Sequence, residues 1–413
     1  MSATQTRSPS ATSDQLQPVP QPRLPTEDAS AGGKADSFED VMKHDDGSKG
    51  MILSMGPQHP STHGVLRLLT HLDGEKVRNV RVDIGYLHRS WEKIMESFTY
   101  PQIVPHSDRN DYLGCAFNEH LVCLAVEKRL GLEPPPQAEY IRVIMCELQR
   151  ICSHLIWVGT FGLDLGATTA FLWSFREREK IYDLFELVTG GRMFPQFFRL
   201  GGVRNDFPPT FFERLEETLR SVERSLGHFQ NLLEGNPIFR SRTQGIARLP
   251  ADAAIAYGCT GPTLRASGVN FDVRRDDPYG IYDRFEFDVP VETGGDCWAR
   301  YLCRMREIPE SIRIIRQAVE GLPGGEVMAG VPRLFRVPPG ESFGHVESPR
   351  GALGVYLVSD GTDRPFRIKW RSPCFSNLHA LERMAPGLYL ADLVAAIGTI
   401  DIVLGEVDRS VRI

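Results

Sequence analysis

AEYIRVIMCELQRICSHLIWVG, residues 138–159, places apolar side chains at intervals of three and four positions. This period puts them on one face of an α-helix that packs against other apolar faces. The same period returns at 113–131, 172–190, 209–235 and around 294–321. Most of these stretches end at a glycine, a common helix stop. The pattern predicts a helical bundle at the centre of the fold.

A different period flanks the predicted bundle. VLRLLTHLDGEKVRNVRVDIGY, residues 65–86, alternates apolar and polar residues on either side of Asp73-Gly74, which is the pattern of a β-hairpin. Short strands are expected at 331–361 and 365–373, before a last helix-like stretch at 377–398. We therefore predict an α+β fold that combines an N-terminal β-hairpin region, a central helical bundle and a smaller C-terminal β-containing segment.

Residues 1–47 differ in composition from the rest of the chain. They are rich in Ser, Pro, Gln and Asp, and they bury too little apolar surface to offset the entropy lost on ordering. We expect a disordered acidic tail there. Residues 48–413 are expected to form a single domain, which comprises the hairpin region 48–105, the helical core 106–321 and a segment with short strands and a final helix, 322–413.

The charge of the chain is low and well mixed. Its 413 residues include 47 Lys and Arg and 53 Asp and Glu, a formal net charge of −6 without basic clusters. This composition argues against nucleic acid as a partner, and no dinucleotide or phosphate-loop fingerprint occurs. The N-terminal MSATQTRSPSATS lacks the apolar core of a secretory signal, so we expect a cytoplasmic chain.

Cysteines and apolar runs indicate a buried core rather than a membrane span. The eight cysteines never form a Cys-x-x-Cys pair, so we expect reduced thiols that pack as small hydrophobic side chains. The most apolar segment, residues 151–173, contains His154, Asp164 and several glycines, which are costly in lipid. We interpret it as buried protein core and expect any membrane contact to be peripheral.

Two histidines, His59 and His63, lie four residues apart in GPQHPSTHGVLR, residues 56–67. Three interpretations are open from the residues alone. A spacing of four suits two zinc ligands on one helix face, but Pro60 and Gly64 disfavour a helix and no third ligand is evident. Both can be ordinary loop residues. A histidine, with a pKa of about 6.5, can also donate protons near neutral pH.

A proton-donating histidine needs partners, and two residues are candidates. They are Tyr112 in DRNDYLG and Asp164 in GLDLGA. An acid in so apolar a stretch as that around Asp164 is expected to be buried and therefore paired. A core tyrosine and a helix-capping aspartate are equally compatible with the spacing.

Several long motifs resemble one family. They are GPQHPSTHGVLRL, DIGYLHRSWEKIME, DRNDYL, AVEKRLG, LDLGA, REREKIYDLFELVTGGRM, RLGGV and DIVLGEVDR. That family is the D subunit of proton-pumping NADH:quinone oxidoreductase, respiratory complex I, and the resemblance extends over about residues 50–413. It implies a peripheral-arm protein that forms much of the quinone chamber and binds no cofactor alone, while a neighbouring subunit holds the terminal iron-sulfur cluster.

The resemblance also implies roles for the candidate residues. His63 and Tyr112 match the histidine and tyrosine that hold the quinone headgroup, and Asp164 matches the acid that pairs with that histidine. A reduced quinone takes up two protons, and a histidine with a phenol can donate both. His59 is expected to shape the loop, whose prolines and glycines suit a change of shape that couples quinone reduction to proton pumping.

The fold implied by the resemblance is also that of the large subunit of nickel-iron hydrogenases, which binds its metals through two Cys-x-x-Cys pairs. The matching positions here are Asp111, Gly114, Val403 and Glu406. All four thiolates are missing, and nickel and iron in such a site need soft sulfur ligands. No metal is therefore expected in this chain, and the vacated pocket is expected to take the quinone.

Further charged residues match family positions that line or support the chamber, and we expect them to form ion pairs rather than to touch the quinone. They are Arg109, Asp401, Glu406 and Arg409. Arg89 and Phe194 match positions near the terminal cluster. Many relatives have a histidine in place of Phe194, and a phenyl ring cannot take up a proton. We expect the cluster's midpoint potential to depend less on pH and to be lower, which suits a quinone such as menaquinone.

The partners implied by the resemblance are the terminal-cluster subunit, the adjoining peripheral-arm subunit and the quinone-channel membrane subunit, with quinone as substrate. The implied location is the cytoplasmic side of the bacterial inner membrane, and the isolated chain is expected to be inactive. Three alternatives are open. They are a hydrogenase-like enzyme, a structural scaffold in which His63 and Tyr112 only pack, and an equivalent subunit of a complex that uses a donor other than NADH.

Overall fold

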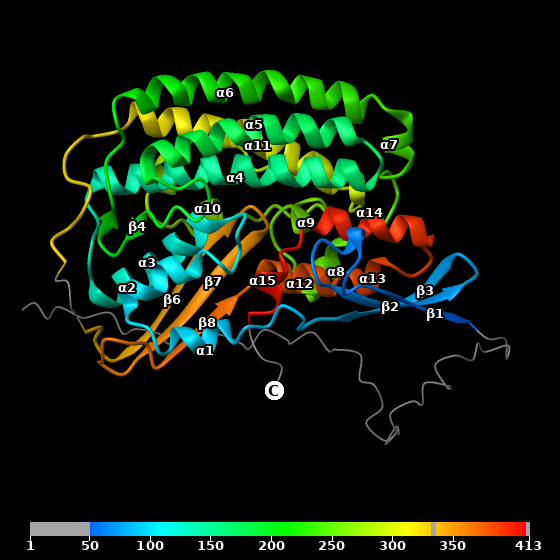
Figure 1. The fold of residues 1–413 in the computed structure, drawn as a ribbon, viewed down its shortest axis with the longest axis horizontal. Helices are drawn as coiled ribbons and strands as arrows, with labels where there is room; N and C mark the ends of the chain where they lie inside the picture. Colours follow the sequence, from blue (N-terminus) through cyan, green and yellow to red (C-terminus); the bar gives the residue numbers. More distant parts are fainter. Residues whose placement is uncertain (1–49, 332–335, 410–413) are drawn as a thin grey trace, which may run out of the picture. The chain divides into compact units, whose positions relative to one another are not determined.

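The helix α4, Pro136–Asp164, runs through the centre of the computed structural model, which describes residues 50–331 and 336–409 (Figure 1). Its side chains are buried on nearly every side, because α5 (Thr168–Thr189) and α11 (Cys297–Glu320) pack along it. Burial of a large apolar side chain contributes about 1.5–3 kcal/mol relative to exposure, so this helix is the main anchor of the fold.

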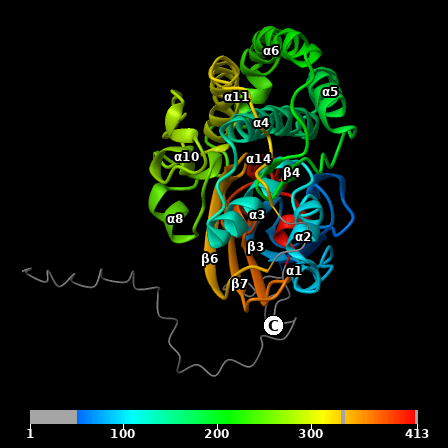
Figure 2. The same ribbon diagram turned by 90° about the vertical axis from the view of Figure 1, so that its left-hand side faces the viewer.

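A fourth helix completes the predicted bundle. α6 (Thr210–Phe229) packs against α5 through a buried apolar stripe and continues into a π-helical turn, Gln230–Glu234. Figure 2 shows α4, α5, α6 and α11 close to end-on, with α6 farthest from the sheets. The helical bundle expected from the period of the sequence is thus confirmed for four of the five predicted stretches, and the fifth, 113–131, forms a helix that packs mainly on the sheet described next.

A three-stranded antiparallel sheet covers the other side of the core. Its strands are β6 (Gly340–Ser348), β7 (Gly351–Ser359) and β8 (Arg367–Arg371), in that order. The helix α3, Cys115–Leu130, packs on β6 and β7. The short strands expected after the bundle are therefore present.

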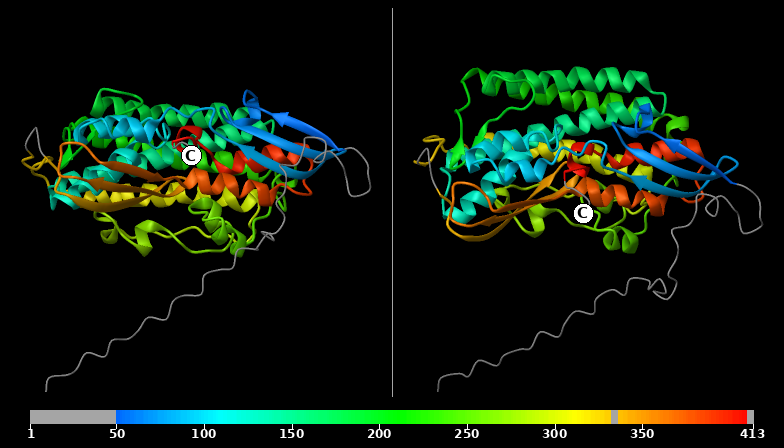
Figure 3. Two further views of the ribbon diagram at one scale, coloured as in Figure 1. Left: turned by 90° about the horizontal axis from the view of Figure 1, so that it is seen from below. Right: turned by 60° about the horizontal axis from the view of Figure 1, so that its bottom comes forward.

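The predicted N-terminal hairpin is also present. β2 (Arg67–Asp73) pairs with β3 (Lys76–Asp83), and the turn between them begins at Gly74 with φ of 59°, a conformation that glycine adopts without strain. A further strand, β1 (Met51–Met55), pairs with the other edge of β2. Figure 3 shows that this sheet extends beyond the helices at one end of the described chain.

These features confirm the predicted α+β class. The remaining short elements are α1 (Trp91–Met95), α2 (Tyr100–Ser107), β4 (Phe198–Arg199), β5 (Gly202–Val203), α7 (Pro237–Ser241), α8 (Ala251–Ala256), α9 (Pro262–Arg265), α10 (Val273–Asp276), a 3₁₀ turn at Tyr282–Arg284 and α15 (Leu404–Val407). Among the described residues, no helix combines the length and apolar character needed to cross a bilayer. The tail predicted at residues 1–47 lies outside the described residues.

Two expectations are corrected by the structure. The stretch 377–398 is not one helix but parts of α12 (Pro373–His379), α13 (Leu381–Met384) and α14 (Leu390–Ile400), because Pro386 and Gly387 interrupt it. The segment 151–173 is buried only in its first part. Leu163 and Leu172 are exposed, because the turn from α4 to α5 emerges at the end of the bundle. All eight cysteines are buried, as expected.

Candidate functional site

The side chains of His63 and Asp164 meet across a long sequence separation, with Nε2 of the imidazole 2.6 Å from Oδ2 of the carboxylate. Asp164 ends α4, and His63 follows a 3₁₀ turn, Pro60–Thr62, with φ of 49°. Positive φ is uncommon for a residue with a Cβ, so the loop holds this side chain in a constrained position. The two side chains are 16% and 14% exposed. The structure thus brings two of the predicted residues together at the surface of the fold.

His59 lies at the other end of the same turn. Its Nδ1 accepts a hydrogen bond of 3.2 Å from the backbone N–H of Ser61, and its carbonyl accepts one of 2.8 Å from the Thr62 hydroxyl. Such local bonds are typical of an N-cap and stabilise the turn. His59 therefore supports the loop that carries His63. Within the described part of the chain, no group of three or more His, Cys, Asp or Glu residues is arranged to hold a metal ion.

Tyr112 lies in the turn between α2 and α3, and its side chain is partly open. The residue is 36% exposed. Burial of the rest of the ring raises the pKa of the phenol, so it stays protonated at neutral pH. A protonated phenol with an accessible edge can donate a hydrogen bond to a ligand. Within the described residues, 50–331 and 336–409, no hydrogen bond or ion pair joins Tyr112 to the His63–Asp164 pair.

One other segment of the chain contacts the end of α4, the His63 loop and the Tyr112 turn. The C-terminal segment, residues 398–406, runs from the end of α14 into α15. It approaches the end of α4, the His63 loop and the Tyr112 turn so closely that a glycine stands at each contact. These contacts are Gly398 against Asp164, Leu404 against Gly64, and Gly405 against Asn110. A Cβ on Gly405 would lie 2.6 Å from the Asn110 carbonyl oxygen, so no larger residue fits without a shift of the backbone.

The four positions that match hydrogenase ligands are tightly packed. Asp111 and Glu406 are 0% exposed, and Val403 is 1% exposed. A Cβ on Gly114 would lie 2.4 Å from Oδ2 of Asp111, so the aspartate carboxylate occupies the space into which a side chain at 114 would project. The Val403 N–H donates to the sulfur of Cys374 at 3.5 Å. The region is filled by polar side chains of the chain itself.

Arg350 completes this region, and sequence analysis missed it. Its Nη1 lies 3.0 Å from Oδ2 of Asp111, and its Nη2 lies 3.1 Å from Oδ1 of Asp401. The two carboxylates raise the pKa of the guanidinium in spite of its burial, so the group stays charged. One signal was available in the sequence, because two buried aspartates require a cation nearby.

Arg89, which was expected near the terminal cluster, and Arg109, which was expected to line or support the chamber, lie near another unpredicted side chain, His106. Burial first, and then the positive charges of Arg89 and Arg109, lower the pKa of His106 to about 4. The Arg109 guanidinium lies 4.6 Å from the centre of the Phe194 ring, within the range of a cation–π contact. Arg89 is exposed. The structure thus places Arg89, Arg109 and Phe194 on one part of the surface.

Glu406 and Arg409 have partners inside the chain. Burial raises the pKa of Glu406, and its Oε1 lies 3.5 Å from the backbone N–H of Cys374. Arg409 donates from Nε to the carbonyl of Trp370 at 3.0 Å and lies 3.8 Å from Glu92. Both residues therefore stabilise the last turn of the fold.

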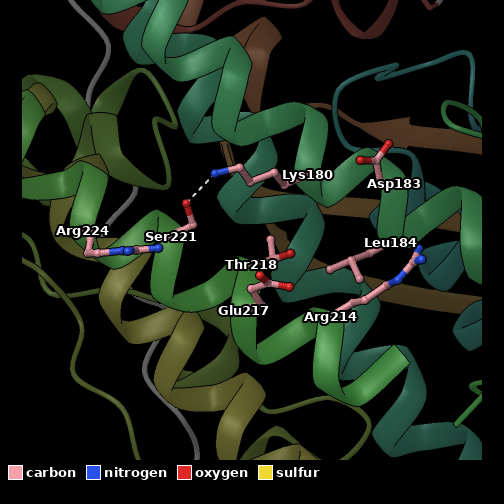
Figure 4. A pocket seen from close by; sticks show the side chains of 8 residues that line it. All are labelled: Lys180, Asp183, Leu184, Arg214, Glu217, Thr218, Ser221 and Arg224. Carbon is pink, nitrogen blue, oxygen red and sulfur yellow. Dashed lines mark hydrogen bonds between the residues drawn. The ribbon is translucent and has the colours of Figure 1, made fainter. Parts of the chain in front are cut away.

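A groove of about 450 Å³ between α5 and α6 lies apart from these residues (Figure 4). Its polar side chains bond to one another, as the 2.5 Å hydrogen bond from Lys180 to Ser221 shows. None of the residues predicted from the sequence lines it.

These observations first define a class. The molecule is an α+β protein whose predicted site residues are proton-carrying side chains at a partly exposed edge of a helical bundle. The model of the family described as respiratory-chain NADH dehydrogenase, 49 Kd subunit, matches residues 164–335 and 331–409. The chain belongs to this family.

Named relatives extend the match over most of the chain. It is 49% identical over 359 residues to the D subunit of NADH-quinone oxidoreductase from Geobacillus thermodenitrificans, a match that covers 87% of this chain and 98% of the relative. The D subunit from Geobacillus kaustophilus is 50% identical over the same shares. The D subunit numbered 2 from Koribacter versatilis is 49% identical over 386 residues, 87% of this chain and 96% of the relative. The resemblance found in the sequence motifs is thereby confirmed.

Proposed function

We propose that this chain, as the D subunit of an NADH-quinone oxidoreductase, forms the chamber in which the quinone is reduced. His63 and Tyr112 hold and protonate the quinone headgroup, and Asp164 keeps His63 ready to donate. The observation that carries this proposal is the His63–Asp164 contact of 2.6 Å, whose two side chains are 16% and 14% exposed. A carboxylate oxygen at that distance holds the imidazole in place through Nε2, and the exposure leaves the pair accessible to a ligand.

The proposed chemistry follows from the charge that reduction creates. A quinone that accepts two electrons becomes a dianion, which must take up two protons to leave as a quinol. The His63 imidazolium can supply one proton and the Tyr112 phenol the other. Neither transfer requires a metal or a covalent intermediate, so the chain contributes hydrogen bonds, position and protons.

The packing refines where the headgroup would bind. The region of Asp111 and Glu406, where the vacated hydrogenase pocket was expected, is filled by buried side chains and by Arg350. Tyr112 is 36% exposed beside this region. We therefore place the headgroup on the open side of Tyr112, toward His63, and assign Asp111, Val403 and Glu406 to the wall behind it.

The other parts of the proposal concern the assembled complex. A partner subunit would hold the terminal iron-sulfur cluster near Arg89 and Phe194, and a membrane subunit would deliver the quinone. The complex would lie on the cytoplasmic side of the bacterial inner membrane and couple the reaction to proton translocation. The surface formed by Arg89, Arg109 and Phe194 supports a docking position for the cluster-bearing partner, because two arginine charges favour reduced, negative centres.

The test is turnover in membranes that carry Tyr112→Phe. We expect NADH oxidation by quinone to fall at least about tenfold, roughly 1.4 kcal/mol in the transition state, while NADH oxidation by a hydrophilic upstream acceptor persists. Tyr140→Phe is a matched control, because Tyr140 is half-buried near the opposite end of α4 from Asp164. If both reactions persist in Tyr112→Phe, the tyrosine only packs and the scaffold interpretation stands.

A further inference from the structure

The turn between β6 and β7 is buried, although turns normally run over the surface of a protein. Ser348 pairs with Gly351 at the end of the hairpin, which leaves Pro349 and Arg350 as the turn. Arg350 is 0% exposed. A charged guanidinium at the tip of a hairpin inside a core is costly unless it is paired, so its position requires an explanation.

The contacts of Arg350 join two distant parts of the chain. Its Nη1 lies 3.0 Å from Oδ2 of Asp111 in the turn before α3. Its Nη2 lies 3.1 Å from Oδ1 of Asp401, and its Nε donates to the Asp401 carbonyl at 2.8 Å. Asp401 ends α14 with φ of 58°. A planar guanidinium presents donors in a fixed fork, so these bonds also fix the orientation of the two carboxylates.

The same bonds position Tyr112. Asp111 precedes Tyr112 in the chain, and its other carboxylate oxygen accepts a bond of 3.1 Å from the N–H of Leu113, the residue after Tyr112. The Asp111 carboxylate that Arg350 holds therefore links the residue before Tyr112 to the residue after it. A rotation of this carboxylate would turn the segment that carries the phenol.

The positive charge of Arg350 also acts on the phenol of Tyr112. The charged and titratable groups around Tyr112 are Arg350 from the hairpin turn, Asp111 from its own turn, Cys374 from α12 and Asp401 from the end of α14. Burial raises the pKa of Tyr112, the two acids and the thiol raise it further, and Arg350 lowers it. The arginine therefore opposes its surroundings and favours loss of the phenol proton.

We propose that Arg350 is a positioning residue for Tyr112, which fixes the turn that carries the phenol and stabilises the phenolate left after proton transfer. This inference rests on the proposed function. In the step, the oxyanion of the two-electron-reduced quinone takes the proton of Tyr112. The phenol O–H bond breaks, a quinol O–H bond forms, and the electron pair stays on the phenol oxygen. Water reprotonates the phenolate at its exposed edge.

A second buried arginine provides a matched control. Arg142 in α4 is also 0% exposed and pairs with two carboxylates, those of Glu127 at 2.6 Å and Glu139 at 2.9 Å. Its partners belong to α3 and α4 and lie away from Tyr112. Changes of Arg142 therefore reproduce the loss of a buried, doubly paired guanidinium without the predicted effect on the phenol.

The experiment is a double-mutant comparison in membranes that contain the assembled complex. Arg350→Gln is measured with Tyr112 present and in a Tyr112→Phe background, and each rate is divided by the rate with the upstream acceptor. We expect Arg350→Gln to lower quinone reduction at least tenfold when Tyr112 is present and less than twofold in the Tyr112→Phe background. We also expect the alkaline limb of the quinone-reduction profile to move to higher pH, because the phenol loses a neighbouring positive charge. Arg142→Gln should lower both reactions in proportion.

Arg350→Lys keeps the inference testable if Arg350→Gln does not assemble. Lysine retains the charge but cannot span both carboxylates, so we expect at least a threefold loss with Tyr112 present and none in the Tyr112→Phe background. Equal losses in the two backgrounds, with either variant, overturn the inference. A normal rate in Tyr112→Phe alone overturns the proposed function instead. A large loss in Tyr112→Phe together with a normal rate in Arg350→Gln overturns only the role of Arg350.

Discussion

Two histidine–carboxylate pairs share the helix α4 and differ in what surrounds them. His154 lies 2.8 Å from Glu307, and both side chains are essentially inaccessible, at 0% and 1% exposure. His63 lies 2.6 Å from Asp164, and these side chains are 16% and 14% exposed. The distances are nearly the same. Accessibility, rather than the geometry of the pair, separates a contact that stabilises the fold from one that can meet a ligand.

The buried pair belongs to a closed network. Glu307 also accepts from Arg265 at 2.6 Å, and Arg265 in turn pairs with Glu347 at 2.8 Å. Burial lowers the pKa of His154, so its imidazole stays neutral at pH 7. The ion pairs of this network therefore join buried groups of α4, α9, α11 and β6 to one another. The His63–Asp164 pair, by contrast, ends at the surface.

The largest expected effect is on the buried pair. Glu307→Ala removes a carboxylate from both Arg265 and His154, and a buried charge left without its partner costs about 3–5 kcal/mol. We expect much less assembled complex on native gels and an unchanged quinone rate for each complex that does assemble. Glu186→Ala, which changes an exposed acid on α5, should assemble normally. Normal assembly of Glu307→Ala with a lost quinone rate would reverse the assignment of the two pairs.

For the partly exposed His63–Asp164 pair we expect the opposite result, a loss of quinone reduction with normal assembly. Asp164→Asn keeps the shape of the side chain but removes the carboxylate that holds the His63 imidazole at 2.6 Å. We expect quinone reduction to fall about a hundredfold, the lower range for loss of a general acid, while assembly is retained because the amide oxygen of asparagine can still accept a hydrogen bond from His63. Asp183→Asn on α5 is the control. Retained turnover together with poor assembly would show that this pair, too, is structural.

A smaller effect is expected in the response to acid. The folded pKa of His154 lies below its unfolded value of about 6.5. The unfolded chain therefore binds more protons as the pH falls below about 6.5, and stability is lost. Glu307 has a lowered pKa, mainly through Arg265, so its contribution is present above about pH 4.3 and is lost below that value.

His154→Gln removes the first of these two contributions. We expect the heat stability of the assembled complex to fall less between about pH 7.5 and about pH 5.5 than in the unchanged protein, with a difference of at most about 1.4 kcal/mol for each pH unit. The surviving upstream activity after heating at each pH is the measurement. His379→Gln, at an exposed residue of α12, should leave the pH response as it was. An unchanged response in His154→Gln would mean that other groups carry the acid sensitivity.

The sequence predicted those parts of the fold that depend on local patterns. The apolar period of α4 and the alternation around Gly74 are properties of neighbouring residues, so both elements were predictable. Pro386 and Gly387 are residues that commonly break a helix, but the apolar residues on both sides of them favour one continuous helix in the prediction. The exposure of Leu163 and Leu172 was not predictable, since it depends on where a helix emerges from the bundle.

The site was predictable only in part for the same reason. An aspartate in an apolar stretch indicated that Asp164 is paired, and the resemblance indicated His63 as its partner. Arg350 was missed because it lies in a Pro-Arg turn between two strands, where a surface position is the ordinary expectation. His106 was missed because its burial depends on tertiary packing and because one of its two arginine neighbours, Arg89, comes from a different segment of the chain. Long-range contacts of this kind leave no periodic trace in the sequence.

The closely packed C-terminal segment has a consequence for how the protein is made. A ribosome adds residues 398–406 long after the His63 loop, the Tyr112 turn and the end of α4, yet those parts rest against Gly398, Leu404 and Gly405. Until Asp401 emerges, Arg350 lacks one of its two acidic partners. An interrupted translation product therefore cannot close its core, and chaperones and proteases meet it as an open chain. The site is therefore complete only after residues 398–406 have been made.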